Sequence, residues 1–541
     1  MNAALSEELR RPEAYGPGVA EVGFLQTHVS WLFFAGERVY KVKKPVDLGF
    51  LDFTTLDRRR FFCSEEVRLN RRLAPDAYLG VVPIRRGPDG RLRVDGGSEP
   101  VAGEVVEWAV EMVRLPEAGM LANLLASGVI DNQMTNDLVA LLSAFHREAA
   151  TGEGIDDHGG PETVRRNLEE NFRQTRAFVD DPGALTAAQH AFLEARGGGF
   201  LDANEGLLER RVQEGRIREG HGDLHAGNIC FTDAGIVAYD CIEFEPRFRC
   251  GDVANDLAFL AMDLDQRGYP AFATWIVKRY ATVTDDAELR GLVGFYKTYR
   301  AVVRGKVTAL AALDPGIDAD ARAGLRRESM RYFQLACSYE LPPALVLMCG
   351  LPASGKSWLA ERLARTLRAV HVASDVRRKV LAGMAARARA REGWGEGLYA
   401  PELKDATYRS LLEGAIDDLT DGHSVLVDAT FAARAHRRAF VDAAARLGLP
   451  YYVVHVTASE ERTRERLAQR AAEGRSASDA DLAVWLRARE AFEAPDEVPE
   501  GHLVAVASGE GVPEDESALL VDRRIAREAP SPGREQSPSM H

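Results

Sequence analysis

Cysteine is scarce in this chain, and its spacing excludes two classes of protein. Only six cysteines occur among 541 residues, and no two of them form a Cys-x-x-Cys pair. Closely spaced pairs would indicate a structural zinc site, and a dense cysteine pattern in a short secreted chain would indicate a disulfide scaffold. The sequence therefore predicts neither, and it favours a reducing location.

Long apolar stretches and a secretion signal are also missing from the sequence. No apolar run approaches the roughly 20 residues that a membrane-spanning helix needs. The first residues, MNAALSEELRRPEAYG, lack the basic start and apolar stretch of a signal peptide. We therefore expect a cytoplasmic protein with no membrane partner.

Positive charge is in deficit. The chain has 68 Lys and Arg against 82 Asp and Glu, which is a formal net charge of −14. A surface that coats nucleic acid normally carries an excess of basic residues. We therefore expect no nucleic-acid partner, and nothing in the sequence indicates an oligomeric state.

What the chain does have is an ordinary globular composition and ample length. Hydrophobic residues make up 46% and charged residues 28%, as in typical soluble domains. A chain of 541 residues has room for two to four domains. The punctuation Leu341-Pro342-Pro343 suggests the main boundary. The predicted parts are an N-terminal segment 1–19, a first domain 20–340, a second domain 341–527 and a disordered, Pro/Ser/Glu-rich tail 528–541.

The first domain combines strands at its start with helices after them. Its predicted strands are 29–34, 38–43, 79–84, 101–113, 229–232 and 236–240, and its predicted helical regions are 56–73, 120–150, 162–215 and 252–338. A strand-rich lobe followed by a helix-rich lobe is the order of a bilobal kinase. We therefore expect an α+β, protein-kinase-like fold for residues 20–340.

The second domain alternates strand and helix. The predicted strands are 345–349, 370–373, 424–427, 451–456 and 503–507, with helical segments between them. That alternation predicts a parallel α/β sheet with helical crossovers. We therefore expect a P-loop NTPase fold for residues 341–527.

A kinase-type catalytic loop is present in the first domain. Residues 221–228 read HGDLHAGN, which places Asp223 five positions before Asn228. In phosphoryl transfer the aspartate accepts the proton of the acceptor hydroxyl, and the amide oxygen binds Mg²⁺. Asp240 ends the following predicted hairpin, where a kinase places its main metal-binding carboxylate. The sequence therefore predicts Asp223 as a catalytic residue and Asn228 and Asp240 as metal ligands.

A lysine for the ATP phosphates and a glutamate to hold it are expected from the preceding strands and helix. Lys41 and Lys43 lie on one face of the predicted strand, and both are candidates, with Lys41 favoured. Glu66 is the favoured partner and Glu65 the alternative. Residues 107–113 are the predicted hinge, whose backbone would pair with adenine.

These motifs together resemble the aminoglycoside phosphotransferase family, over roughly residues 20–335. The segment GDVANDLA at residues 251–258 resembles that family's helix after the metal-binding aspartate, which implies that Asp256 braces the catalytic loop. A glycine-rich loop is missing, since residues 27–31 read THVSW, and the family also lacks a strict one. Aminoglycosides are not thereby implied as substrates, because one fold hosts many functions.

A complete Walker A motif opens the second domain. Residues 350–357 read GLPASGKS, directly after an apolar strand and before a helical pattern. In this motif glycines let backbone N–H groups wrap the phosphates, lysine reaches the β/γ-phosphates and the hydroxyl binds Mg²⁺. The predicted nucleotide-binding residues are Gly350, Ser354, Gly355, Lys356 and Ser357. Ser357 and Asp428, which ends the strand VLVD, are the predicted metal ligands.

Other polar residues of the second domain are candidates for contacting the acceptor and for forming the lid over the nucleotide. Asp375 follows a predicted strand, and it reads either as a catalytic base or acceptor clamp or as a helix N-cap. Arg466 and Arg470 share a helix face with Arg462. They read as lid arginines that neutralise the transferring phosphate, or as a solvated helix face.

Residues 344–510 are similar to the zeta-toxin and gluconate-kinase-like group of P-loop kinases. The whole chain resembles bacterial fusions of an aminoglycoside-phosphotransferase-like domain with a P-loop domain. We therefore expect a bifunctional, ATP- and Mg²⁺-dependent phosphotransferase that acts on hydroxyls of small molecules. The alternatives are a nucleotide-binding regulator and a toxin-like P-loop kinase that the first domain controls.

Overall fold

A computed structural model of the chain describes residues 2–16, 18–49, 51–95, 102–180, 184–314, 316–384, 401–473, 482–508 and 520–526. Two compact units form: Met1–Glu170, Gly198–Leu264 and Tyr269–Arg300 make the first, and Asn171–Gly197, Asp265–Gly268 and Ala301–His541 make the second. These units cut the chain elsewhere than residue 341, because the helical segments 171–197 and 301–340 belong to the same unit as the C-terminal sheet. The domain boundary at 341 stays a prediction, and the predicted tail 528–541 lies outside the described residues.

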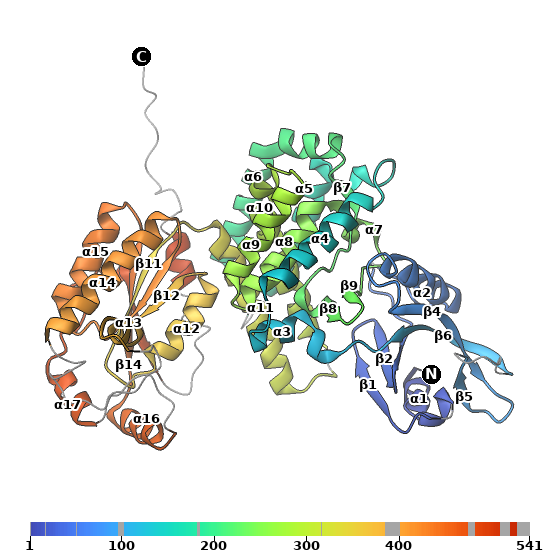
Figure 1. Ribbon diagram of the computed structural model, residues 1–541, viewed down its shortest axis with the longest axis horizontal. Coiled ribbons are helices and arrows are strands. Elements are labelled where there is room, and N and C mark those ends of the chain that lie inside the picture. The colour runs from blue at the N-terminus through green and yellow to red at the C-terminus, as the bar shows by residue number, and fades with distance from the viewer. Residues whose placement is uncertain are drawn as a thin grey trace, which may run out of the picture. The chain divides into compact units, whose positions relative to one another are not determined.

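The first unit opens with a six-stranded antiparallel sheet (Figure 1). Its strands are β1 (Val22–Gln26), β2 (Ser30–Ala35), β3 (Arg38–Lys43), β4 (Tyr78–Arg86), β5 (Leu92–Val94) and β6 (Glu104–Val113). They are ordered β1-β2-β3-β6-β4-β5, so that β6 lies inside the sheet, between β3 and β4. The strand content predicted for this region is therefore present.

The pleat of β2 explains how this sheet builds a core. Trp31, Phe33 and Ala35 are buried, whereas the residues between them are partly exposed, which is the period of two that a half-buried strand requires. Leu9 and Ala14 pack into the same cluster. They come from α1 (Asn2–Leu9) and the 3₁₀ turn η1 (Pro12–Tyr15), so the N-terminal segment is part of this core.

Helix α2 (Leu56–Asn70) packs against the sheet and carries one polar side chain into it. Thr55 caps its first turn by accepting a hydrogen bond from the Arg58 N–H. Cys63 and Val67 lie in a core cluster with Val110 of β6. Glu66 lies between them in the sequence and is fully buried, so it needs charged partners of its own.

Helices and two short strand pairs follow the sheet. The helices are α3 (Leu121–Ser127), α4 (Asn132–Glu148), α5 (Pro161–Thr175), α6 (Ala187–Gln213), α7 (Pro246–Arg249), α8 (Val253–Gln266), α9 (Pro270–Val283) and α10 (Leu289–Ala311). The strand pairs are β7 (Ile217–Glu219) with β10 (Cys250–Asp252), and β8 (Ile229–Thr232) with β9 (Gly235–Ala238). The HGDLHAGN segment joins β7 to β8, so both pairs anchor its ends.

The second unit contains a five-stranded parallel sheet. Its strands are β11 (Leu345–Cys349), β12 (Val370–Ala373), β13 (Val425–Asp428), β14 (Tyr451–Thr457) and β15 (Leu503–Ala507). They are ordered β12-β13-β11-β14-β15 and all pairings are parallel. Helices lie on both sides of the sheet (Figure 1). The predicted parallel α/β sheet is confirmed.

The helices that lie wholly within the second unit are α11 (Ala319–Glu340), α12 (Lys356–Thr366), α13 (Ser374–Leu381), α14 (Pro401–Thr420), α15 (Arg434–Arg446), α16 (Glu460–Glu473) and α17 (Leu482–Glu490). Leu345, Leu347 and Cys349 of β11 form a buried cluster with Leu411 of α14 and Phe440 of α15. The central strand is buried along its whole length, as a parallel sheet covered on both faces requires.

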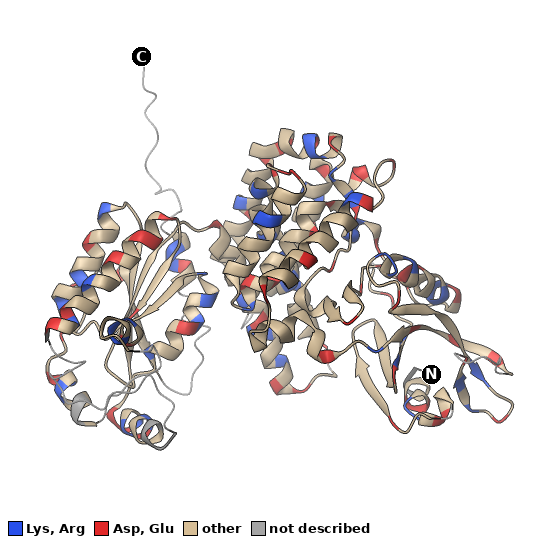
Figure 2. Ribbon diagram, viewed as in Figure 1, with Lys and Arg blue, Asp and Glu red and all other residues tan. Residues whose placement is uncertain are grey.

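Charges of both signs are interspersed along the described helices of each unit (Figure 2). Among the described residues, no helix is both long enough and apolar enough to cross a membrane.

Candidate active sites

The backbone of the HGDLHAGN segment explains its glycine. Gly222 has φ 82°, a left-handed conformation that side chains with a Cβ rarely adopt. A Cβ at this position would lie 2.7 Å from the Phe248 carbonyl oxygen. Both constraints require glycine directly before Asp223, so the glycine sets how the aspartate is presented.

A buried carboxylate holds this backbone in place. Asp256 of α8 accepts hydrogen bonds from the N–H groups of His221 (2.6 Å) and Gly222 (2.8 Å). Burial alone would raise the pKa of Asp256, but His146, whose Nε2 lies 3.5 Å from the carboxylate, and the nearby charges lower it well below its usual range. His146 is itself buried and bonds Tyr280 through Nδ1 at 2.8 Å. Asp256 therefore braces the loop, as the resemblance implied, and His146 packs behind it.

Asp223 and Asn228 lie side by side at the end of this loop. The Asn228 amide donates to Asp223 Oδ2 at 3.2 Å and to the Asp223 carbonyl at 3.1 Å. His225 Nε2 lies 3.6 Å from the same Asp223 oxygen. The side-chain N–H group of Asn228 faces Asp223, so the amide oxygen of Asn228 is left to point toward a metal ion.

Asp240 follows β9 in a strained conformation. Its φ is 64°, which is uncommon for a residue other than glycine and typical of functional sites. Its N–H donates to the Tyr78 hydroxyl at 3.2 Å, and its carboxylate lies 2.6 Å from Lys41 Nζ. The side chain is 46% exposed, so it can also reach a ligand.

The two lysines of β3 share one buried glutamate. Lys41 Nζ lies 2.7 Å from Glu66 Oε1, and Lys43 Nζ lies 2.7 Å from Glu66 Oε2. Burial alone would raise the pKa of Glu66, but the two ammonium groups outweigh it and lower the pKa to about 2. Lys43 is 1% exposed and Lys41 11%. Lys41 is therefore the more accessible of the two candidates, while Glu66 serves both.

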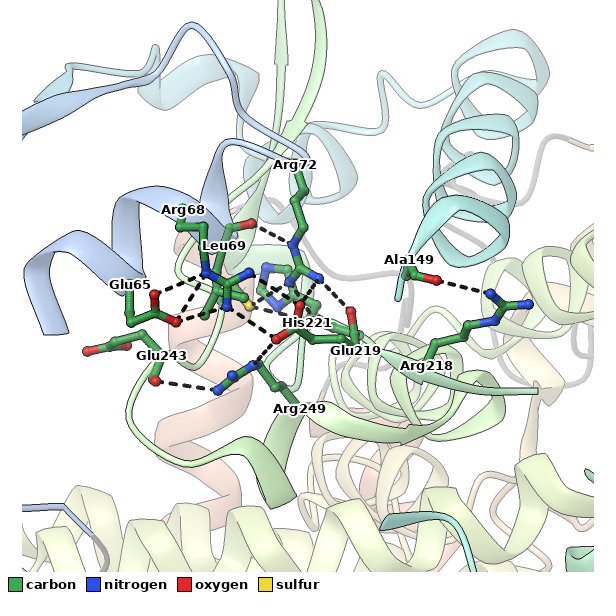
Figure 3. Close-up of polar contacts among 12 residues, drawn as sticks. Glu65, Arg68, Leu69, Arg72, Ala149, Arg218, Glu219, His221, Glu243 and Arg249 are labelled. Carbon is green, nitrogen blue, oxygen red and sulfur yellow. Dashed lines mark hydrogen bonds and ion pairs between the residues drawn. The ribbon is translucent and has the colours of Figure 1, made fainter. Parts of the chain in front are cut away.

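Helix α2 also contacts the segment before the catalytic loop. Figure 3 shows Arg68, Arg72 and Arg249 around the Glu219 carboxylate, at 3.3, 3.4 and 3.1 Å. Arg72 also donates to the Gly220 carbonyl at 2.9 Å. Burial opposes ionisation of Glu219, but the arginines outweigh it and lower its pKa. Arg68 of α2, the helix that carries Glu66, and Arg72 just after it thereby contact the segment that leads into the catalytic loop.

The predicted hinge at residues 107–113 is wrong. These residues belong to β6, and residues 109–112 among them pair with β3 on one side and β4 on the other. A backbone committed to two ladders has no groups left for adenine. Glu107 instead turns its side chain to Arg59, whose guanidinium lies 2.8 Å from it.

The second site is built on the P-loop between β11 and α12. Gly350, Ala353 and Gly355 have φ of 151°, 61° and 98°. A Cβ at Gly350 would lie 2.3 Å from the Val456 carbonyl oxygen. Left-handed residues in a short loop turn successive N–H groups inward and form an anion-binding concavity. The predicted residues Ser354, Lys356 and Ser357 lie in this loop and on the first turn of α12.

The sheet brings Asp428 to this loop. Met348 of β11 is directly opposite Asp428 of β13 in the parallel register, so both strands end at the same edge. Burial alone would raise the pKa of Asp428, but the nearby side chains of His371, Lys356 and Ser357 outweigh it and lower the pKa. Asp428 Oδ1 is buried without a hydrogen-bond partner. An orphaned carboxylate oxygen beside a serine hydroxyl fits an oxygen-liganded cation such as Mg²⁺.

Arg466 of α16 reaches the P-loop. Its Nη1 donates to the carbonyls of Ala353 (3.2 Å) and Ser354 (3.0 Å) and to the Ser508 hydroxyl (2.8 Å). Arg470 lies on the same helix, in a part whose side chains fall outside the described residues. The structure therefore places Arg466 at the loop and does not describe how Arg470 points.

Asp375 lies in the first turn of α13, whose N-cap is Ala373. It is therefore not the N-cap, which was the alternative prediction. Its carboxylate lies 3.2 Å from Arg378. In the register of the sheet Ala373 pairs with Asp428, so Asp375 follows the strand end that borders the second site.

No group of three or more His, Cys, Asp or Glu side chains in the described ranges is arranged to hold a metal ion. The two predicted metal sites do not require such a group. Each combines one carboxylate with one other oxygen ligand: Asp240 with the amide of Asn228, and Asp428 with the hydroxyl of Ser357. Mg²⁺ in such sites takes few protein ligands and completes its shell with phosphates and water.

Sequence reasoning missed three residues at these sites. Glu243 contacts Lys43, the Tyr78 hydroxyl accepts a hydrogen bond from the Asp240 N–H, and the Ser508 hydroxyl accepts one from Arg466. Glu243 stands three positions after Asp240, but no periodicity or motif distinguishes it from its neighbour Glu245. Contacts between distant segments leave no local signal of this kind.

Comparison with known proteins gives a family match for part of the chain and relatives for most of it. Residues 345–495 match the family described as AAA domain. The uncharacterised protein Rv2004c of Mycobacterium tuberculosis (strain ATCC 25618 / H37Rv) is 30% identical over 471 residues, which cover 86% of this chain and 89% of that protein. An uncharacterised protein of Mycobacterium bovis (strain ATCC BAA-935 / AF2122/97) matches to the same extent.

Solved structures give weaker likenesses. A choline/ethanolamine kinase family protein from Mesorhizobium loti is 12% identical and covers 60% of this chain and 92% of its own, with a TM-score of 0.36. A gluconokinase from Sinorhizobium meliloti 1021 is 19% identical and covers 35% of this chain and 94% of its own, with a TM-score of 0.25. Both scores are too low to establish a shared fold.

Proposed function

The chain belongs to the same protein family as the two mycobacterial proteins, and we propose that it is an ATP-dependent phosphotransferase with two separate MgATP sites. The observation that carries the proposal is the convergence of Lys41, Glu66 and Asp240 in one unit. They come from β3, α2 and the end of a distant hairpin, yet they meet within 2.7 Å. Phosphoryl transfer needs a cation and a metal-binding carboxylate at such a point.

In the first site each residue has a distinct role. Lys41 binds the ATP phosphates and Glu66 orients it. Asp240 and the Asn228 amide oxygen hold Mg²⁺, which when bound shields the phosphate charge. Asp223 orients the acceptor hydroxyl and accepts its proton as the acceptor oxygen bonds to the γ-phosphorus, while the bond to the bridging oxygen of the departing ADP breaks. The bilobal, kinase-like arrangement expected for residues 20–340 is part of this proposal.

In the second site the P-loop supplies the phosphate cradle. The N–H groups of residues 350–357 and the N-terminus of α12 face the phosphates, and Lys356 reaches the β/γ-phosphates. Ser357 and Asp428 hold Mg²⁺. Arg466 and Arg470 neutralise charge on the transferring group. Asp375 serves as the base or clamp for the acceptor, which its place after the β12 strand end supports.

The acceptors are small molecules with hydroxyl groups. A library of metabolites incubated with γ-labelled ATP tests this, with wild type, Asp223→Ala and Lys356→Ala in parallel. We expect two sets of labelled products, one lost in each variant. ATP binding without any labelled acceptor would favour a nucleotide-binding regulator instead. If ATP turnover and binding were the same in all three proteins, the proposal would be wrong.

A further inference from the structure

The second lysine of β3 has partners of its own. Lys43 lies 2.7 Å from Glu66 Oε2 and also contacts Glu243 Oε1. Lys43, Glu66 and Glu243 are all buried. Together with Lys41 and Asp240 they form a row of alternating charge, which we call the charge row: Asp240, Lys41, Glu66, Lys43 and Glu243.

Both ends of the charge row lie on one loop. Asp240 and Glu243 are three positions apart, whereas the inner members come from β3 and α2. Two ion pairs therefore join the loop to the sheet, one between Asp240 and Lys41 and one between Glu243 and Lys43. A single ion pair would leave the loop free to turn about it, but two ties fix its orientation as well as its distance.

The backbone of this loop needs such support. Asp240 has φ 64°, and a strained residue persists only where its surroundings over-determine it. Other contacts hold the main chain: the Cys241 N–H donates to Asn70 Oδ1 at 2.8 Å, and Arg249 donates to the Glu243 carbonyl at 3.4 Å (Figure 3). Lys43 is the partner of the Glu243 carboxylate.

Burial makes this arrangement costly unless it serves a purpose. The row holds three carboxylates and two ammonium groups, and burial together with the neighbouring Glu66 raises the pKa of Glu243 despite the nearby Lys43. Buried ion pairs contribute little net stability compared with apolar residues of the same size. A role in geometry explains them better than a role in stability.

We propose that Lys43 and Glu243 are positioning residues, whose ion pair sets the orientation of the Asp240 carboxylate and of Lys41. The proposal rests on the proposed function of the first site and adds a second lysine–glutamate pair to it. Removing the Glu243 carboxylate should let the loop open more often in the free protein and should weaken Mg²⁺-dependent nucleotide binding.

Cys241 reports on the loop without any ligand. It lies between Asp240 and Glu243, is 2% exposed, and its Sγ lies 3.4 Å from Arg72 Nη2. Alkylation of the nucleotide-free protein with iodoacetamide, mapped by mass spectrometry, measures how often the loop opens. We expect Glu243→Leu to speed alkylation of Cys241 about tenfold or more. Cys349, buried in the other unit's sheet, should keep its rate and serves as the internal reference.

Glu107→Leu is the matched control. Glu107 is also a buried glutamate of the first unit and is paired with Arg59, but its contacts are to β6 and α2 instead of the loop. A merely structural effect of losing a buried carboxylate should appear equally in both variants. Glu243→Gln keeps an oxygen that can accept a hydrogen bond from Lys43, so we expect it to recover most of the Cys241 protection.

Nucleotide binding supplies the second measurement. With Lys356→Ala present to silence the P-loop site, ATP is titrated calorimetrically at several Mg²⁺ concentrations. We expect Glu243→Leu to raise the Mg²⁺ concentration for half-saturation about tenfold and Glu107→Leu to leave it unchanged. Lys43→Arg, which keeps the charge, should stay near the parent value.

The outcomes separate this proposal from the proposed function. If the Lys356→Ala parent binds no ATP, the first site is not a nucleotide site, and Cys241 alkylation still decides whether the pair holds the loop. If Glu243→Leu matches Glu107→Leu in both measurements, the positioning role is overturned. Should Glu243→Leu fail to fold, Glu243→Asp, which withdraws the carboxylate by one methylene, gives the same test with an intermediate effect expected.

Discussion

The ammonium group of Lys41 lies 2.6 Å from the carboxylate of Asp240, although 199 positions separate the two residues along the chain. Burial alone would lower the pKa of Lys41, but the carboxylates of Asp240 and Glu66 raise it well above its usual value. Lys41 is therefore charged throughout the physiological range. The strand lysine and the hairpin aspartate meet because β3 and the segment after β9 converge on one point.

Lys41→Met should weaken the first site far more than the second. The change removes a charge that the proposed reaction uses and leaves Glu66 paired with Lys43. We expect a loss of about 10²–10³ in kcat/KM for the acceptor of the first site, similar to the loss of one preorganised electrostatic group. Turnover of the acceptor of the P-loop site is the internal control, and an equal loss there would contradict the assignment.

Asp223→Asn should lower catalysis and spare nucleotide binding. Asparagine keeps the size of the side chain but cannot accept the hydroxyl proton. We expect kcat of the first site to fall about 10²–10⁴-fold, the range for general-base removal. Calorimetric titration should give an unchanged ATP affinity. A variant with full kcat would show that another group accepts the proton.

Gly350→Ala should abolish ATP binding at the P-loop site alone. The added Cβ would lie 2.3 Å from the Val456 carbonyl oxygen in a left-handed conformation, so the loop cannot keep its shape. Binding stoichiometry measured by calorimetry should fall from about two ATP to about one. Gly199→Ala, in helix α6 with open space around its Cβ, is the control and should bind as wild type does.

Arg59→Met should destabilise the first unit strongly. The change leaves the buried carboxylate of Glu107 without its partner, since Arg59 Nε donates to its two oxygens at 3.0 and 2.9 Å. We expect a loss of about 3–5 kcal/mol in the free energy of unfolding in urea. The double variant Arg59→Met/Glu107→Leu should recover most of it, because burial outweighs Arg59 and already raises the pKa of Glu107. Equal losses in both variants would contradict this account.

The stability of the first unit should fall as pH drops below about 6.5, the ordinary pKa of histidine. His221 Nδ1 accepts the Asp223 N–H at 3.2 Å, and Nε2 faces the Tyr239 carbonyl at 3.1 Å. This network requires the neutral ring protonated on Nε2. Burial lowers the pKa of His221, although Asp256 opposes it. The unfolded chain therefore binds more protons below pH 6.5, and stability present above that pH is lost toward acid.

The variant His221→Gln checks this effect. It has no group that titrates in this range, so its free energy of unfolding should vary less between pH 7 and pH 5 than that of wild type. The difference in slope should reach at most about 1.4 kcal/mol per pH unit for one proton. His158 also titrates with a lowered pKa, but it contributes equally to both proteins. Parallel pH profiles would exclude His221 as the source.

Local pattern was enough to predict most elements. The strand-like runs at residues 29–34 and 38–43 predicted β2 and β3, and the apolar run 345–349 before GLPASGKS predicted β11 and its loop. These signals depend on neighbouring residues only. The hinge failed for the opposite reason: whether a strand lies at the edge or inside a sheet depends on which strands pair with it, and β6 is paired on both sides.

The sequence by itself determined the two motifs and the residue types that phosphate chemistry needs. HGDLHAGN and GLPASGKS are each a run of consecutive residues, so their functional groups are close together whatever the rest of the fold is. Only the tertiary structure decided how the two lysines of β3 divide their partners. Lys41 faces Asp240 and Lys43 faces Glu243, since α2 brings Glu66 between them. Two residues on the same strand face carry the same local pattern, so only the long-range packing of α2 and the Asp240 loop distinguishes them.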